Sequence, residues 1–235
     1  VGFAQQLPPI VKYSKENYNA GIQNWMISQD SHQYMYYANN EGLFEWNGLK
    51  VILNSSPNET IIRSVKCIND RIYTGAFMEF GYWQRAKNGQ LFYTSLSASI
   101  KSKINEDEQF WGIFPFDNWI LFQSLEKIYA YNTKTNTFTI INPNSTINKA
   151  FKTSNGIYFQ TSNGLYEIDQ GKSKLFLSNE IINQNKLINI LDTKNGLILV
   201  TQKQGLFYYS NGVLSKFSTN IDAEIQQSNI YSSQL

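Results

Sequence analysis

One short pattern returns about every 41 residues along this chain of 235 residues. In each copy an aromatic and apolar alternation ends at a turn with asparagine or glycine, and the copies lie at 42–48, 80–89, 127–136, 164–171 and 205–212. Apolar runs stand before and after each copy, so one unit holds four strand-like segments. Four antiparallel strands joined by tight turns form one blade of a propeller.

We therefore predict an all-β fold, a β-propeller of four-stranded antiparallel blades. The predicted blades lie at 24–57, 60–97, 108–143, 147–179 and 185–219, and the start of a sixth lies at 229–235. About five blades and a fraction do not close a ring, so we expect part of a larger propeller. Residues 1–23 are expected to hold a signal-peptide remnant and an extended lead-in, and residues 24–235 the partial propeller. A β-sandwich has strands at similar spacing, but it would not repeat them in register in every unit.

The composition fits half-buried strands. Aromatic residues make up 15% of the chain and charged residues only 16%, as expected for pleated sheets with polar turns. The net charge is +2 and the lysines are scattered singly, whereas nucleic-acid binding needs a concentrated basic stripe. We expect no nucleic-acid partner in this segment, a turn of helix only near residues 99–107, and a buried, unreactive thiol at Cys67, the only cysteine.

The first part of the chain resembles a known family. The lead-in LPPIVKYSKENYNAGIQNWMISQD, followed by YMYYANNEGLFEWNG, is similar to the start of the two-component-regulator propeller proteins of Bacteroidetes-type bacteria. The later copies GLYEID and GLFYYSNG resemble that family's repeat, and the resemblance runs from about residue 7 to the end. Two copies depart from the pattern: Lys127 stands where the glycine is expected, and Phe77, Met78 and Glu79 enlarge one loop.

The resemblance implies a periplasmic sensor region that is anchored to the membrane in the full-length protein. In the family a triple-tyrosine module, a membrane helix and a cytoplasmic output module follow, the last being a histidine kinase or a LuxR-type DNA-binding domain. The stimulus in relatives is often a glycan. The expected partners are therefore an oligosaccharide or other small molecule, the downstream domains of the same polypeptide, and a second copy in a homodimer. Residues 1–5 look like the end of a secretory signal, which agrees with export.

Enzymatic and metal chemistry find little support in the sequence. His32 is the only histidine, so a metal cluster and a Ser-His-Asp triad both lack their usual residues. Glu41, Glu45 and Glu79 are the acids available for a carboxylate pair, and we expect Glu45 on an outer face. We predict a non-enzymatic chain with no catalytic residue, no metal and no cofactor. A propeller glycosidase or lyase remains the less favoured alternative.

The candidate ligand site follows from aligning the repeats. The first strand of each blade lines the central channel of a propeller, and the alignment puts Trp25, Arg63, Trp111 and Asn148 at matching starts of that strand. Rings beside a guanidinium and amides suit sugars, whose C–H faces stack on aromatic rings. The predicted ligand-binding residues are Trp25, Arg63, Trp111, Asn40, Glu41, Phe77 and Glu79. The alternatives are that the tryptophans pack blade against blade, or that the propeller is a scaffold that binds another protein.

Overall fold

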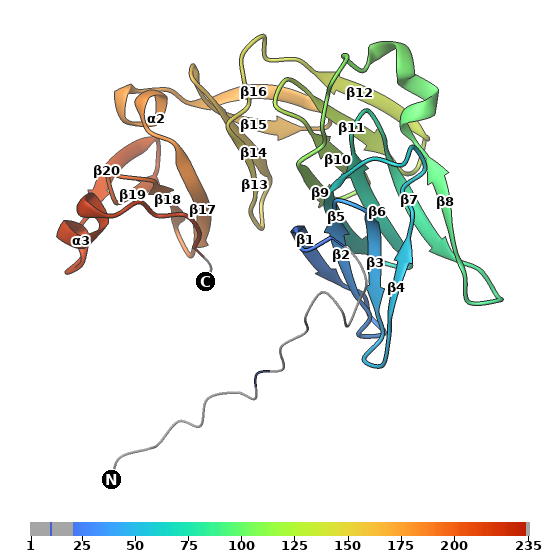
Figure 1. Cartoon of the computed structure of the whole chain (residues 1–235). Coiled ribbons are helices and arrows are strands. Elements are labelled where there is room, and N and C mark those ends of the chain that lie inside the picture. Colours follow the sequence, from blue (N-terminus) through green and yellow to red (C-terminus); the bar gives the residue numbers. More distant parts are fainter. Residues whose placement is uncertain (1–9, 11–20, 234–235) are drawn as a thin grey trace.

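Five four-stranded antiparallel sheets make up the computed structural model, which describes residue 10 and residues 21–233 (Figure 1). Within each sheet the strands are hydrogen-bonded in the order in which they occur along the chain. This is the blade topology expected from the repeat, so the all-β propeller prediction is confirmed. Most of the predicted lead-in, residues 1–9 and 11–20, lies outside the described residues.

The blades are named by their order along the chain. Blade 1 contains β1 (Asn24–Gln29), β2 (Met35–Asn39), β3 (Gly42–Trp46) and β4 (Val51–Asn54). Blade 2 contains β5 (Ile62–Ile68), β6 (Arg71–Ala76), β7 (Phe80–Arg85) and β8 (Leu91–Ser95). Blade 3 contains β9 (Gly112–Phe116), β10 (Trp119–Gln123), β11 (Ile128–Asn132) and β12 (Thr137–Ile141). Blade 4 contains β13 (Lys149–Lys152), β14 (Ile157–Thr161), β15 (Gly164–Asp169) and β16 (Lys172–Leu177). Blade 5 contains β17 (Leu187–Thr193), β18 (Gly196–Thr201), β19 (Leu206–Ser210) and β20 (Val213–Phe217).

The blades follow one another along an arc. The first strands of successive blades are in contact, β1 with β5, β5 with β9, β9 with β13 and β13 with β17. These strands form the inner side of the arc, and blade 5 lies at the opposite end from blade 1 (Figure 1). Side chains that start from different first strands can therefore meet.

The apolar core is divided into four clusters, one at each junction between neighbouring blades. Tyr36 and Leu43 of blade 1 pack with Val65 of blade 2, and the other three junctions repeat this arrangement. The alternation of side chains along each strand produces these junction clusters. Each sheet turns one set of side chains toward the preceding blade and the other set toward the next. Each blade therefore depends on its neighbours for burial, as in other repeat proteins.

A glycine begins the third strand where the backbone requires one. Gly42 has a φ of +142°, and a Cβ there would lie 2.4 Å from the Asn54 carbonyl oxygen. Gly164 is similar, with a φ of +146°. Lys127, which replaces this glycine in blade 3, is not among the described residues with positive φ. The exception in the repeat is thus allowed by a different backbone conformation.

Three short helices interrupt the strands. The 3-10 helix η1 (Ser97–Lys103) overlaps the predicted turn near residues 99–107. Two others were not predicted, α2 (Glu180–Gln184) and α3 (Asp222–Gln227). Each is little more than one turn long and buries a single apolar residue, Ile182 or Ile225, so neither leaves a helical periodicity in the sequence.

The segment after α3 begins as the other blades begin. The Ile230 N–H donates to the Gln202 carbonyl at 3.0 Å, as the Ile147 N–H donates to the Leu125 carbonyl at 2.7 Å. Ile147 lies two residues before β13, the first strand of blade 4. Residues 229–233 nevertheless form no strand, so the sixth blade stays a prediction.

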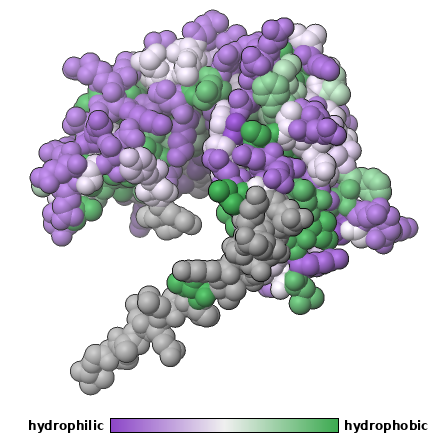
Figure 2. All heavy atoms as spheres, in the orientation of Figure 1, coloured by the Kyte–Doolittle hydropathy of each residue, from purple (hydrophilic) through white to green (hydrophobic). Residues whose placement is uncertain are grey.

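Hydrophilic residues cover most of the face seen in Figure 2, and hydrophobic residues show as several separate areas. Large apolar side chains that are exposed occur on the outer strands of four blades: Leu53, Phe92, Leu175, Val213 and Phe217. They are spread along the arc because they come from successive blades.

Candidate functional site

The first strands begin with β-bulges, which aim individual side chains into the inner side of the arc. The register of β1 with β2 skips Trp25, that of β5 with β6 skips Arg63, and that of β17 with β18 skips Ile188. In blades 3 and 4 the equivalent N–H groups of Trp111 and Asn148 donate to the next strand at 2.8 Å. A bulge re-aims the side chain of the extra residue. The predicted alignment of Trp25, Arg63, Trp111 and Asn148 is therefore seen in the register.

Trp25, Arg63 and Trp111 meet, and they are called here the Trp/Arg cluster. The Arg63 guanidinium carbon lies 4.2 Å from the centroid of the Trp25 ring and 4.7 Å from that of the Trp111 ring. The two indoles approach edge to face, with centroids 5.8 Å apart. Stacking of a guanidinium on indole is the strongest common cation–π contact in proteins. Three blades thus contribute one side chain each to a single cluster.

Hydrogen bonds fix two members of the cluster. The Trp25 Nε1–H donates to Asn40 Oδ1 at 2.7 Å, and the Arg63 Nε–H donates to Gln109 Oε1 at 2.7 Å. Trp25 keeps 37% of its surface exposed, so it remains accessible to a ligand. Asn40 belongs to the predicted set, whereas Gln109 was missed because it lies before β9 in a segment without strand pattern.

The charge of Arg63 is incompletely satisfied. Its Nη1 is buried and has no hydrogen-bond partner among the described residues. Burial also lowers the pKa of the Arg63 guanidinium. A buried N–H group without an acceptor costs about 1–3 kcal/mol, and more when the group is charged. Such a group is a candidate for contact with a ligand.

A pocket of about 330 Å³ opens beside Arg63 and is called the Arg63 pocket. Polar side chains form most of its lining, which consists of Asn40, Glu59, Thr60, Arg63 and Gln109 together with the apolar Ile61 and Phe77. Two hydrogen bonds hold the loop that carries Phe77. The Phe77 carbonyl accepts from Asn58 Nδ2 at 2.7 Å, and the Met78 N–H donates to the Glu108 carbonyl at 2.7 Å. The enlarged loop of blade 2 therefore forms a wall of this pocket.

Two predicted residues, Glu41 and Glu79, belong neither to the Trp/Arg cluster nor to the lining of the Arg63 pocket. Glu79 accepts hydrogen bonds from the Tyr93 hydroxyl at 2.9 Å and from Ser95 Oγ at 2.7 Å, so its carboxylate joins strands within blade 2. Glu41 donates its N–H to Asn39 Oδ1 at 3.0 Å in the β2–β3 turn. A ligand role for either residue stays a prediction.

A larger groove lies along the first strands and is called the lysine groove. It has a volume of about 580 Å³. Its lining joins Trp111 and Asn148 to aromatic, amide and lysine side chains, including Phe114, Pro115, Gln123, Lys66, Lys149 and Lys152. Lys66 is far from Lys149 and Lys152 in the sequence, but the arc brings β5 and β13 to one groove. The lysines are scattered singly along the sequence, and the fold places these three in the lining of one groove.

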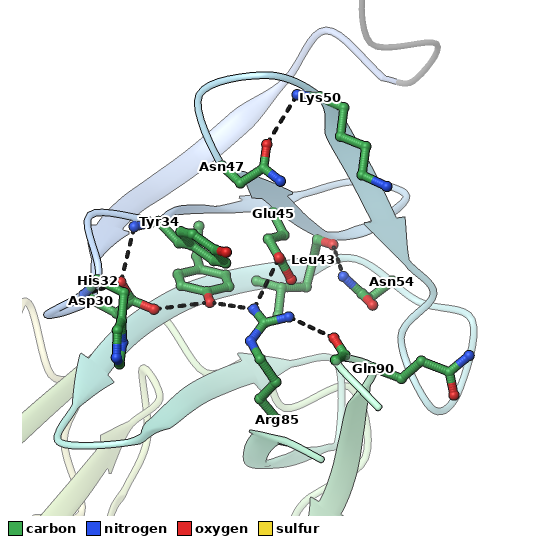
Figure 3. Close-up of polar contacts among 12 residues, drawn as sticks. Asp30, His32, Tyr34, Leu43, Glu45, Asn47, Lys50, Asn54, Arg85 and Gln90 are labelled. Atoms are coloured by element: carbon green, nitrogen blue, oxygen red, sulfur yellow. Dashed lines mark hydrogen bonds and ion pairs between the residues drawn. The ribbon is translucent and has the colours of Figure 1, made fainter. Parts of the chain in front are cut away.

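A polar network joins blades 1 and 2 (Figure 3). It lies near the β1–β2 turn, at the opposite end of β1 from Trp25. Glu45 is only 3% exposed and forms an ion pair with Arg85 at 2.9 Å. Arg85 Nη2 also donates to the Tyr36 hydroxyl at 3.0 Å, and that hydroxyl donates to Asp30 Oδ2 at 3.1 Å. The expected outer-face position of Glu45 is wrong, because the partner that permits its burial comes from the next blade.

This network borders a third pocket, of about 240 Å³. Its lining holds charges of both signs: Asp30, Asp70, Arg71 and Arg85. Arg85 is already paired with Glu45, and Arg71 stacks at 4.2 Å on the Tyr82 ring. The charges here are satisfied within the protein, which makes this pocket a weaker candidate than the other two.

His32 and Cys67 are the only histidine and the only cysteine of the chain. His32 is exposed in the β1–β2 turn. Cys67 is partly buried, and burial raises the pKa of its thiol to about 11, so the unreactive thiol form dominates at neutral pH. Within residue 10 and residues 21–233, no group of three or more His, Cys, Asp or Glu side chains could hold a metal ion. In the same residues no helix has the length and hydropathy needed to cross a bilayer.

Similarity to known proteins comes from structure alone, since no family model and no curated protein matches this sequence. The extracellular domain of BT4673 from B. thetaiotaomicron is 19% identical with a TM-score of 0.61, over 84% of this chain and 28% of that one. Two structures of this domain describe BT4673 as a one-component system and as a hybrid two-component system. The chain thus spans 28% of the length of that domain.

Other similar structures come from different settings. PorZ, a surface component of the type-IX secretion system of Porphyromonas gingivalis, has a TM-score of 0.63 at 12% identity, over 93% of this chain and 37% of PorZ. The WD40 propeller domain of Doa1 has a TM-score of 0.56 at 11% identity, over 88% of this chain and 70% of that domain. Similarity at such low identity establishes the fold and leaves function to the site. The chain has a β-propeller fold.

Proposed function

We propose that this chain belongs to the extracytoplasmic sensor region of a bacterial signalling regulator and binds a glycan fragment at the Trp/Arg cluster. The observation that carries this proposal is the Arg63 guanidinium packed against two indoles, with a buried Nη1 that has no acceptor among the described residues and a pocket beside it. Sugar rings stack on indoles through their C–H faces. A sugar hydroxyl or carboxylate in the Arg63 pocket would supply the missing acceptor.

The similarity to the extracellular domain of BT4673 supports the location and the signalling role. In this proposal the chain is exported, is anchored to the membrane as part of a longer polypeptide, and passes the binding event to downstream domains of that polypeptide or to a second copy. Both output types, a histidine kinase and a DNA-binding domain, fit a sensor of this kind.

The lining of the pockets supports binding without catalysis. Of the residues that the structure describes, Glu59 is the single carboxylate that lines the Arg63 pocket, and the lysine groove has none. Glycoside hydrolysis usually requires two carboxyl groups on opposite sides of the scissile bond. The exposed apolar side chains are spread over several blades, whereas a protein-binding scaffold would favour one continuous apolar patch.

Binding is tested by titrating the full chain with a panel of oligosaccharides in a calorimeter. We expect Arg63→Lys to weaken the best ligand about tenfold, because lysine keeps the charge but loses the planar stacking and the fork of donors. Arg71→Lys is the matched control, since Arg71 stacks on Tyr82 in the same blade but lies outside the Arg63 pocket.

The control should bind as the wild type does. Equal losses in Arg63→Lys and Arg71→Lys would contradict a site at the Trp/Arg cluster, and the absence of binding across the panel would favour the scaffold alternative. Fractionation of the source bacterium tests export separately, because a cytoplasmic chain would exclude the sensor proposal.

A further inference from the structure

The lysine groove is lined by three lysines that come from two different first strands. Lys66 comes from β5, and Lys149 and Lys152 come from β13. Among the described residues that line the groove there is no aspartate or glutamate. The same groove holds Trp111 and the amides of Asn148 and Gln123. Cations, an indole and amides thus share one surface of the inner side.

These lysines are not paired elsewhere. In the part of the chain that the structure describes, the one ion pair joins Arg85 to Glu45. Lys66 and Lys152 are exposed and make no side-chain hydrogen bond to the described residues. Lys149 Nζ donates to the Ile188 carbonyl at 2.8 Å, and burial together with the nearby Lys186 lowers its pKa. The groove therefore attracts negative charge.

The excess is local and does not reflect the whole chain. The sequence has 20 lysines and arginines against 18 aspartates and glutamates, which is close to balance. The five first strands, by contrast, carry four cations, Arg63, Lys66, Lys149 and Lys152, against one acid, Asp192. Asp192 Oδ2 already accepts from the Ser154 N–H at 2.6 Å. Positive potential is concentrated on the inner side, where it can select a ligand.

The groove and the Trp/Arg cluster are continuous through Trp111. This indole lines the lysine groove and also contacts the Arg63 guanidinium, 4.7 Å from its ring centroid. A ligand of several sugar rings that stacks at the cluster would therefore extend along Lys66 and the β13 lysines. Each acidic group along such a ligand would meet an unpaired cation.

We propose that the lysine groove binds an acidic oligosaccharide, one whose rings carry carboxylate or sulfate groups. This inference rests on the proposed function and narrows its ligand class. The indole and the amides favour a carbohydrate over other polyanions, because stacking and hydroxyl recognition are supplied beside the charges. The lysines select the acid, and the Trp/Arg cluster selects the ring.

The test compares tetragalacturonate, a sulfated chondroitin disaccharide and uncharged maltotetraose, each titrated into the full chain by calorimetry. We expect an acidic probe to bind at least about tenfold more tightly than maltotetraose at low salt. This preference should shrink when sodium chloride is raised to about 0.5 M, because salt screens exposed charges. The two acidic probes distinguish carboxylate from sulfate recognition.

Two double variants locate the effect within the molecule. Lys66→Gln/Lys152→Gln removes two groove charges that make no ion pair or side-chain hydrogen bond with the described residues, and we expect it to weaken the acidic probe about tenfold. Lys172→Gln/Lys174→Gln removes two exposed charges from β16, on the outer edge of blade 4, and should leave binding unchanged. Thermal melting of both variants checks that they are folded.

The results separate the two proposals. If maltotetraose binds as well as the acidic probes, or if both double variants lose the same affinity, the acidic-ligand inference falls while glycan binding stands. If no probe in the set binds, the inference also falls, and the Arg63→Lys titration over the wider panel then decides the proposed function on its own.

Discussion

Glu45 shows how a single residue in this chain depends on a neighbouring blade. Its carboxylate is almost fully buried, and Arg85 lies 2.9 Å away on β7 of blade 2. Arg85 also donates to the Gly89 carbonyl at 2.7 Å and lies over the Tyr34 ring at 5.1 Å. Burial raises the pKa of the Tyr36 hydroxyl in the same network, so that group keeps its proton and can donate. The pair therefore stabilises the junction of blades 1 and 2.

Arg85→Met should destabilise the protein strongly, because it leaves the Glu45 carboxylate buried without a partner. We expect the free energy of unfolding to fall by about 3 kcal/mol, measured by urea denaturation. Arg71→Met, which removes a stacked arginine with no ion pair in the described residues, should cost less than about 1 kcal/mol. The double variant Glu45→Gln/Arg85→Met should regain part of the loss. Equal costs for the two single variants would rule out a stabilising role for the pair.

At this scale the sequence predicts some residues and misses others for a clear reason. Trp25, Arg63 and Trp111 can be found because each occupies the same position in its repeat. Glu45, Gln109 and the groove lysines cannot be found in this way, because their partners come from other blades. Local pattern shows which side of a strand a residue faces, but not what lies opposite.

At the start of the third strand, the glycine in the repeat matches a backbone conformation that requires glycine. Gly42→Ala should cost about 3 kcal/mol, because its Cβ would meet the Asn54 carbonyl oxygen at 2.4 Å in addition to the strain of a φ of +142°. Gly212→Ala is the control: its φ is +80° but no atom lies within 4 Å of the added Cβ, so it should cost about 1 kcal/mol. Chemical denaturation measures both, and equal losses would show that the carbonyl contact has no influence.

Strands could be predicted more fully than helices for a physical reason. Each strand repeats the same alternation, so copies in other units reinforce a weak signal. The helix α2 has no such copies and depends on a local cap, in which Asn179 accepts from the Ile182 N–H at 2.9 Å. Five residues do not define a helical period. The helix α2 is therefore found only in the structure.

The whole molecule is organised by contacts between successive blades. Each apolar cluster belongs to one junction, so the arc follows from the angle repeated at each of them. The repeat predicts the blades but not this curvature, and it is the curvature that brings Lys66 to the same groove as Lys149 and Lys152. The ligand surface is thus a property of the assembled arc.

Junctions that pack separately should also loosen separately. Leu199→Ala at the blade 4–blade 5 junction and Leu43→Ala at the blade 1–blade 2 junction each remove a fully buried side chain. We expect a local loss of about 3 kcal/mol from each. By hydrogen exchange, Leu199→Ala should raise rates in β17–β20 and spare β1–β4, whereas Leu43→Ala should do the reverse. Leu175→Ala, at a half-exposed outer-strand site, should change neither. If both core variants raise exchange in the same set of amides, the arc unfolds as one cooperative unit and stability is not confined to neighbouring blades.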